Sequence, residues 1–214
     1  MTAYISAILK DKITNEDVTN IISKEAGLKP DYLIPSMYSQ GFGVTFGTQG
    51  NLKKIGDLKN CTVMVANLVV KTGEVGIIQL TPKKAETEHE MEILMSEMDA
   101  LIFKTEIKDR VISYELYVNF IKDGKDAIQR KIILPELKTM EKPMSFGLRI
   151  FEGDLTDQDI RIQPWKQINI EPVVQDPTKL TITMIFRNKH LEKNIISKGY
   201  EDLEKLLNFL KEEK

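Results

Sequence analysis

An alternation of apolar and polar residues constrains this chain more than any other feature. In residues 111–121, Tyr114 and Leu116 fall on one parity and Glu115 on the other. Successive side chains of a β-strand point to opposite faces of a sheet, so this segment predicts a strand with one face on a core and the other toward water. Similar short segments recur between residues 61 and 187, which predicts a mainly antiparallel meander.

Other strands are predicted from the same pattern and from the turn residues that bound each segment. The expected strands are residues 3–9, 41–47, 62–70, 75–81, 101–107, 128–134, 145–151, 160–163, 167–174 and 180–187. Residues 62–70 are apolar on both parities, which indicates a central strand covered on both faces. Pro164 follows the segment 160–163 and Pro172 lies within the segment 167–174, which favours edge strands there.

Three helices are expected to pack on this sheet. Thr14, followed by two acidic residues, predicts a helix start, and Gly27 predicts its end. Helical spacing of apolar residues predicts a second helix over residues 86–99 and a third near the C-terminus. Gly199 is expected to separate this last helix from a helical turn at residues 191–196. The predicted apolar stripes are Val18, Ile21 and Ile22; Met91, Leu94, Met95 and Met98; and Leu203, Leu206, Leu207 and Leu210.

The predicted fold class is therefore α+β. We expect a curved antiparallel sheet that closes toward a barrel or sandwich, covered by an N-terminal helix, one inserted helix and a C-terminal helix. Residues 48–59 are polar and predict turns, with one short helical turn at residues 52–55. A chain of 214 residues can bury roughly 70% of its unfolded surface. We expect a single domain over residues 1–214, with a weak seam near residue 99.

The composition argues against several classes of partner. Hydrophobic residues make up 42% and charged residues 29% of the chain, and the formal net charge is −2. A charge so close to zero removes the electrostatic argument for nucleic acid or an anionic membrane. Cys61 is the single cysteine, so no internal disulfide is expected, which suits a reducing compartment. No signal peptide or membrane-spanning run is evident, and we expect a soluble cytoplasmic protein.

The residues that usually carry catalysis form no recognised motif here. His89 lies in an acidic run, but residues 85 and 93 are Ala85 and Ile93, so the i,i+4 pair of a zinc helix is missing. His190 follows the last predicted strand and is a candidate general base. Cys61 starts a strand that is expected to be buried, which favours an inert thiol. The sequence predicts neither metal nor cofactor, and it favours a non-enzymatic protein.

The leading hypothesis is a binding or assembly module that recognises a protein partner or forms a homo-oligomer. Its contact surface is expected at edge strands or at the face that carries Trp165. A second hypothesis is an apolar ligand-binding cup lined by Met64, Met95 and Met184. A third is a hydrolase or transferase that uses scattered carboxylates with one of the two histidines.

Overall fold

The computed structural model describes ten segments of the chain: residues 1–22, 36–38, 52–70, 73–84, 87–105, 107–124, 147–153, 164–173, 175–192 and 194–211. The strands are β1 (Thr2–Leu9), β2 (Ser36–Tyr38), β3 (Lys53–Asp57), β4 (Cys61–Val70), β5 (Gly73–Pro82), β6 (Val111–Asp123), β7 (Leu148–Gly153), β8 (Trp165–Val173) and β9 (Asp176–Asn188). The helices are α1 (Asn15–Ile22), α2 (Glu88–Lys104) and α3 (Ile195–Lys211), with a short 3-10 turn, η1 (Lys108–Arg110).

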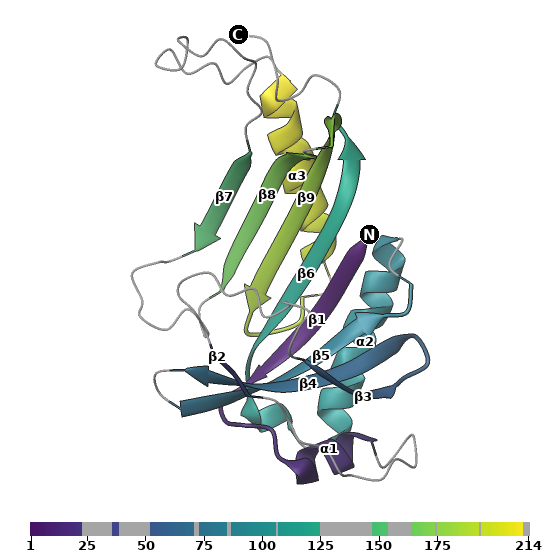
Figure 1. The fold of residues 1–214 in the computed structure, drawn as a ribbon, viewed down its shortest axis with the longest axis vertical. Helices are drawn as coiled ribbons and strands as arrows, with labels where there is room; N and C mark the ends of the chain where they lie inside the picture. The colour runs from purple at the N-terminus through teal and green to yellow at the C-terminus, as the bar shows by residue number, and fades with distance from the viewer. Residues whose placement is uncertain are drawn as a thin grey trace.

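The described strands form one continuous, strongly twisted sheet (Figure 1). The strand order is β2-β4-β5-β1-β6-β9-β8-β7, and β3 also pairs with β4. All pairings are antiparallel except that of β2 with β4. The predicted α+β class, with an N-terminal, an inserted and a C-terminal helix, is confirmed. The sheet is open in this order, with β2 at one end and β7 at the other.

Helices α2 and α3 lie on the same face of the sheet, which we call the helix-covered face (Figure 1). Helix α2 packs against β1 and β5, and α3 lies behind β6, β9 and β8 in Figure 1. One large apolar cluster joins both helices to the sheet. Its fully buried members include Ile5 of β1, Met98 of α2, Met184 of β9 and Leu203 of α3. This cluster is the main core.

The strand β4 lies inside the sheet, as the sequence predicts. It pairs with β5 along one edge and with β2 and β3 along the other. Val63 and Val65 belong to the main core, whereas Ala66 and Leu68 belong to a smaller apolar cluster on the opposite face of the sheet. The two-sided apolar pattern therefore reflects burial on both faces.

Two predictions between residues 52 and 107 are wrong. The expected strand at residues 101–107 is instead the end of α2, because Leu101 and Ile102 continue the helical spacing and are buried in the main core. The expected helical turn at residues 52–55 lies in the strand β3, which pairs along the edge of β4 with a shift in register. Backbone pairing with a neighbouring strand decides the structure of this polar segment.

Gly199 does not separate two helical segments, because α3 runs through it without interruption. A Cβ at this position would lie 2.3 Å from Cζ of Phe186 in β9. The glycine therefore allows the helix to lie close against the sheet. The predicted apolar stripe is confirmed at Leu203 and Leu207, which are buried, and the side chain of Leu210 lies outside the described residues.

Two further expectations concern the exposure of strands. The prediction of an edge strand at residues 167–174 is wrong, because β8 pairs with β7 on one side and β9 on the other. The polar parity of β6 does not face water throughout, because Ser113 and Glu115 are buried. The expected strands at 41–47, 128–134 and 160–163, and the expected helix end at Gly27, lie outside the described residues.

Candidate functional site

A line of side chains crosses the sheet on the face opposite the helices. Its members, each paired in register with the next, are Met64, Gln79, Ser6, Glu115, Arg187, Trp165 and Gly153. Directly opposite residues of antiparallel strands point to the same face, so these positions form one row across β4, β5, β1, β6, β9, β8 and β7. We call it the cross-sheet row. Its middle is polar and buried, from Gln79 to Arg187.

A buried ion pair lies at the centre of the cross-sheet row. Arg187 donates through Nη2 to Oε2 of Glu115, and the exposed fractions of the two side chains are 2% and 0%. The hydroxyl of Tyr4 donates to the other carboxylate oxygen of Glu115 at 3.5 Å. A charge at this depth is tolerated only when it is paired, so the ion pair constrains β6 and β9 to their observed register.

Aromatic rings cover the outer end of this ion pair. The guanidinium carbon of Arg187 lies 4.9 Å from the ring centroid of Trp165, a cation–π distance. Trp165 in turn stacks on Phe151 of β7, with centroids 5.5 Å apart and an interplanar angle of 24°. Trp165 is half-buried, whereas Phe151 is 38% exposed. Through Trp165, the cross-sheet row is therefore in contact with an exposed aromatic ring of the last strand, Phe151.

The strand β7 presents an unpaired edge within the described part of the chain. It pairs with β8 alone and ends the strand order. Its side chains include Leu148, Ile150 and Phe151, with Arg149 between them. An edge that carries apolar residues is a template for pairing with another strand.

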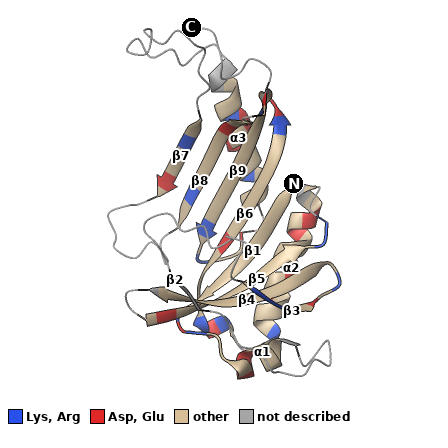
Figure 2. Cartoon of the chain, viewed as in Figure 1, with Lys and Arg blue, Asp and Glu red and all other residues tan. Residues whose placement is uncertain are grey.

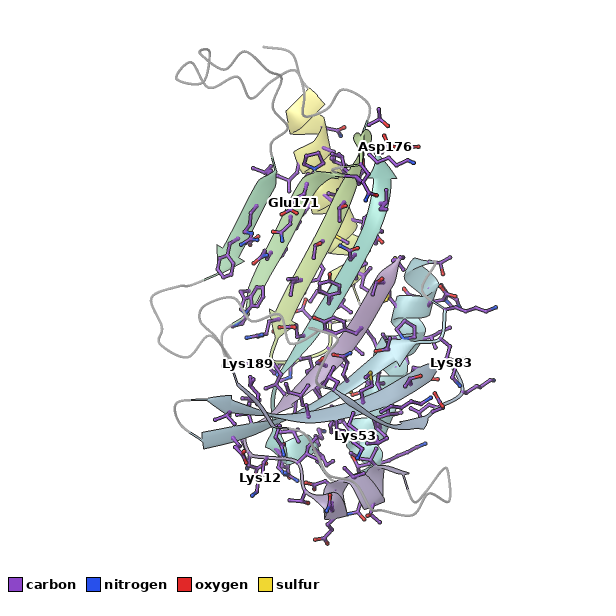
Figure 3. The ribbon with its side chains drawn as sticks, viewed as in Figure 1. Lys12, Lys53, Lys83, Glu171, Asp176 and Lys189 are labelled. Carbon is purple, nitrogen blue, oxygen red and sulfur yellow. The ribbon has the colours of Figure 1, made fainter. Side chains whose placement is uncertain are left out.

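At the other end of the sheet both β2 and β3 pair with β4, and both differ from β7 in ways that usually block strand addition: β2 has only three residues. There β3 carries Lys53 and Lys54, which Figure 2 shows as a blue segment, and Figure 3 labels Lys53. The pairing of β3 with β4 also shifts register between Lys54 and Gly56. Edge lysines and bulges are common devices against edge-to-edge association. Among the described edges of the sheet, the edge of β7 is therefore the one suited to pair with another strand.

The helix-covered side of β7 and β8 is held by a lysine. Lys166 Nζ lies 2.6 Å from Oε2 of Glu152 in β7 and 2.7 Å from Oδ2 of Asp202 in α3. Burial lowers the pKa of Lys166, but the hydrogen bonds to Asp202 and Glu152 outweigh it, and the pKa lies above its usual value. The lysine therefore stays protonated at neutral pH and anchors β7 to β8 and α3.

The three methionines of the predicted cup do not converge on one cavity. Met64 lies on the face opposite the helices, where its sulfur is 4.0 Å from Oγ1 of Thr81. Met184 is fully buried in the main core. Met95, on α2, lines a cleft between α2 and β6.

The two histidines and the cysteine lie in three different environments. His89 is exposed on the first turn of α2, with Nδ1 3.6 Å from Oε2 of Glu92. Among the described residues no three histidine, cysteine or acidic side chains gather as metal ligands. His190 lines the same cleft as Met95. The Cys61 thiol lies 2.8 Å from Oε2 of Glu97, and burial, together with that carboxylate, raises its pKa above the usual value. Because the thiolate is disfavoured, the Cys61 thiol is expected to be unreactive.

Sequence reasoning placed Trp165 near the site but missed Glu115, Arg187 and Phe151. Arg187 is the last residue of the predicted strand 180–187, where a charged residue normally marks the approach to solvent. Glu115 and Arg187 are 72 residues apart in the chain, and only the pairing of β6 with β9 brings them together. The one local signal was a carboxylate in a strand that carries large side chains on both parities, including Tyr117.

Comparisons with known proteins add no family. No protein-family model, no curated protein and no solved structure matches this chain. Within the described residues no helix is both long and apolar enough to cross a membrane.

Proposed function

We propose that this protein is a non-enzymatic assembly module that joins a second copy of itself through the edge of β7. The observation that carries the proposal is the outer edge of β7, with which no described strand pairs, and the exposed ring of Phe151 held in place on Trp165. Rings that are already ordered lose little conformational entropy on binding, so they make effective contacts.

The residue order of β7 favours a second copy as the partner. In an antiparallel two-fold pairing centred on Ile150, Arg149 of each chain would lie opposite Phe151 of the other. A guanidinium beside an aromatic ring is a favourable pair, and the symmetry would form it twice. The two Ile150 side chains would meet on the helix-covered face, which extends the apolar pair that Ile150 makes with Ile168. Centring on Phe151 would instead place Ile150 opposite Glu152, a poor match.

A closed dimer follows from this geometry. A two-fold axis at β7 uses the described edge that has these features, whereas the other end of the sheet carries the three-residue β2 and the lysine-bearing β3, both paired with β4. The two sheets would join into one longer sheet without offering a second equivalent edge.

A cysteine placed at the symmetry centre tests the pairing. Ile150→Cys is expected to form a disulfide-linked dimer under mild oxidation, because directly opposite Cα atoms lie within roughly 4.5–5.5 Å, inside the range a disulfide spans. Non-reducing electrophoresis gives the result. The native Cys61 is buried and does not compete.

The matched control is Lys54→Cys, which places an exposed thiol on the edge strand β3 at the far end of the sheet. It is expected to remain monomeric under the same oxidation. Cross-linking of Lys54→Cys as fast as Ile150→Cys, or no cross-link at Ile150→Cys, contradicts the proposed interface.

A further inference from the structure

A cleft of about 500 Å³ opens on the helix-covered face, away from β7. The helix α2 forms one wall with Glu92, Met95, Ser96 and Asp99, which recur at i, i+3, i+4 and i+7 and so share one side of the helix. Tyr114 of β6, Lys108 of η1, and His190 and Leu191 after β9 complete the lining. This volume lies within the range typical of small-molecule sites, about 300–1,000 Å³.

The wall opposite α2 is held by local hydrogen bonds. Asn188 donates through Nδ2 to Oε1 of Glu192 at 2.5 Å, and its own Oδ1 accepts from the backbone amide of Lys189 at 2.7 Å. These bonds bracket the turn that carries His190 and Leu191, which follows the Lys189 labelled in Figure 3. Leu191 also packs against the main core. The cleft is therefore formed before any ligand arrives.

Three polar groups of the cleft have unused bonding capacity. Within the described residues, no hydrogen bond or ion pair involves the Asp99 carboxylate, the Tyr114 hydroxyl or the His190 ring. Tyr114 is half-buried, and its pKa is raised first by burial and then by the negative charge of Asp99. Asp99 therefore acts electrostatically on the space beside the tyrosine, which favours a positive ligand there.

The other charged residues of the cleft do not reverse this preference for a positive ligand. Glu92 adds a second carboxylate, and its contact with His89 is an ion pair only when that histidine is protonated. Lys108 is the one lysine or arginine in the described lining, and its Nζ lies 5.5 Å from the ring centroid of Phe103. Two carboxylates against one ammonium group make the lining acidic at neutral pH.

An apolar cavity extends from the cleft toward the core. A second, much narrower cavity shares Met95, Tyr114, His190 and Leu191 with the cleft. The rest of its lining is mainly apolar, with Ile5, Leu116, Phe186 and Ile195, together with Asn188 and Glu192, which bond to each other. A ligand would therefore meet polar groups at the mouth and an apolar wall behind them, the usual arrangement of a small-molecule site.

We propose that this cleft binds a small primary ammonium compound with an apolar body. The ammonium group donates hydrogen bonds to the Asp99 carboxylate and the Tyr114 hydroxyl, and the apolar body lies between Met95 and Leu191. The site is separate from the β7 edge, so the proposed ligand binding and the proposed assembly can be tested independently.

Three probes of similar shape and different charge test this site. They are 2-phenylethylammonium, neutral 2-phenylethanol and anionic 3-phenylpropanoate, each titrated against the full chain at neutral pH and followed by ligand-detected NMR. The ammonium probe is expected to bind about tenfold more tightly than the alcohol, because a hydrogen bond to a charged group is worth at least that factor. The anion is expected to bind more weakly than either.

The variant Asp99→Asn is expected to remove the tenfold preference for the ammonium probe. It should fold normally, since Asp99 is exposed and makes no described hydrogen bond, and an unchanged thermal midpoint checks this. The matched control Glu201→Gln removes one exposed carboxylate from α3, outside the cleft, and is expected to keep the preference. Equal or tighter binding of the anion, a preference that survives Asp99→Asn, or no binding of any probe at millimolar concentration would overturn the proposal.

Discussion

Replacing Arg187 with methionine is expected to lower the free energy of unfolding by about 3–5 kcal/mol. The substitution leaves the Glu115 carboxylate buried without the guanidinium that pairs with it. An uncompensated charge in an apolar interior costs several kcal/mol, far more than the ion pair itself contributes. Urea unfolding followed by circular dichroism measures the difference, and the fluorescence of Trp165, the single tryptophan, reports on the same region.

The double variant Glu115→Leu with Arg187→Met separates this mechanism from a simple loss of packing. Because it removes both charges, it is expected to recover most of the lost stability. Lys179→Met is the matched surface control: it breaks an exposed ion pair with Asp176 and should leave stability nearly unchanged. A double variant as unstable as Arg187→Met alone would show that the buried charge is not the cause.

Gly76→Ala is expected to destabilise the protein by about 2–4 kcal/mol, through overpacking and a weakened hydrogen bond. The loop after β1 crosses β5 at this glycine, and the Gly76 amide donates to the Asp11 carbonyl at 2.7 Å. A Cβ here would lie 2.7 Å from Cγ1 and 2.9 Å from the backbone nitrogen of Ile13. The backbone on both sides must shift, and Ile13 would leave its place in the main core.

The matched control is Gly147→Ala, next to β7. Its Cβ would meet Cγ of the exposed Glu171 side chain at 3.1 Å, and that side chain can move aside. Chemical unfolding of both variants should give a large loss for Gly76→Ala and little change for Gly147→Ala, because alanine also restricts the unfolded chain. Equal effects at the two positions would contradict the close approach of the loop to β5.

The sequence predicted the elements whose apolar spacing is regular over many residues. The alternation in residues 111–121 and the helical spacing of Leu203 and Leu207 both give the correct element in the structure. Prediction from the sequence failed where the local pattern suits more than one kind of element. Leu101 and Ile102 suit a strand by composition, yet they bury the last turns of α2 against the sheet. The polar strand β3 has no such signal, because its partner β4 supplies the pairing.

The candidate site was harder to predict because the cross-sheet row joins residues from seven strands. Trp165 stood out as the single tryptophan, but its contacts with Arg187 and Phe151 depend on the order β9-β8-β7. Likewise, His190 and Asp99 reach the same cleft only because α2 and the turn after β9 lie on one face of the sheet. Strand order and helix placement are long-range properties, and no local spacing encodes them.

The mass of the protein in solution tests the proposed assembly most directly. Sedimentation velocity of the full chain, with a monomer mass of 24.5 kDa, is expected to give twice that mass at micromolar concentration. Phe151→Ala should shift the population to monomer, because it removes the exposed ring opposite Arg149 of the second copy. Ile121→Ala removes a more exposed apolar side chain, 63% accessible, from β6, away from the edge, and should leave the dimer intact. A monomer at every concentration, or a dimer that Phe151→Ala leaves unchanged, would contradict assembly through β7.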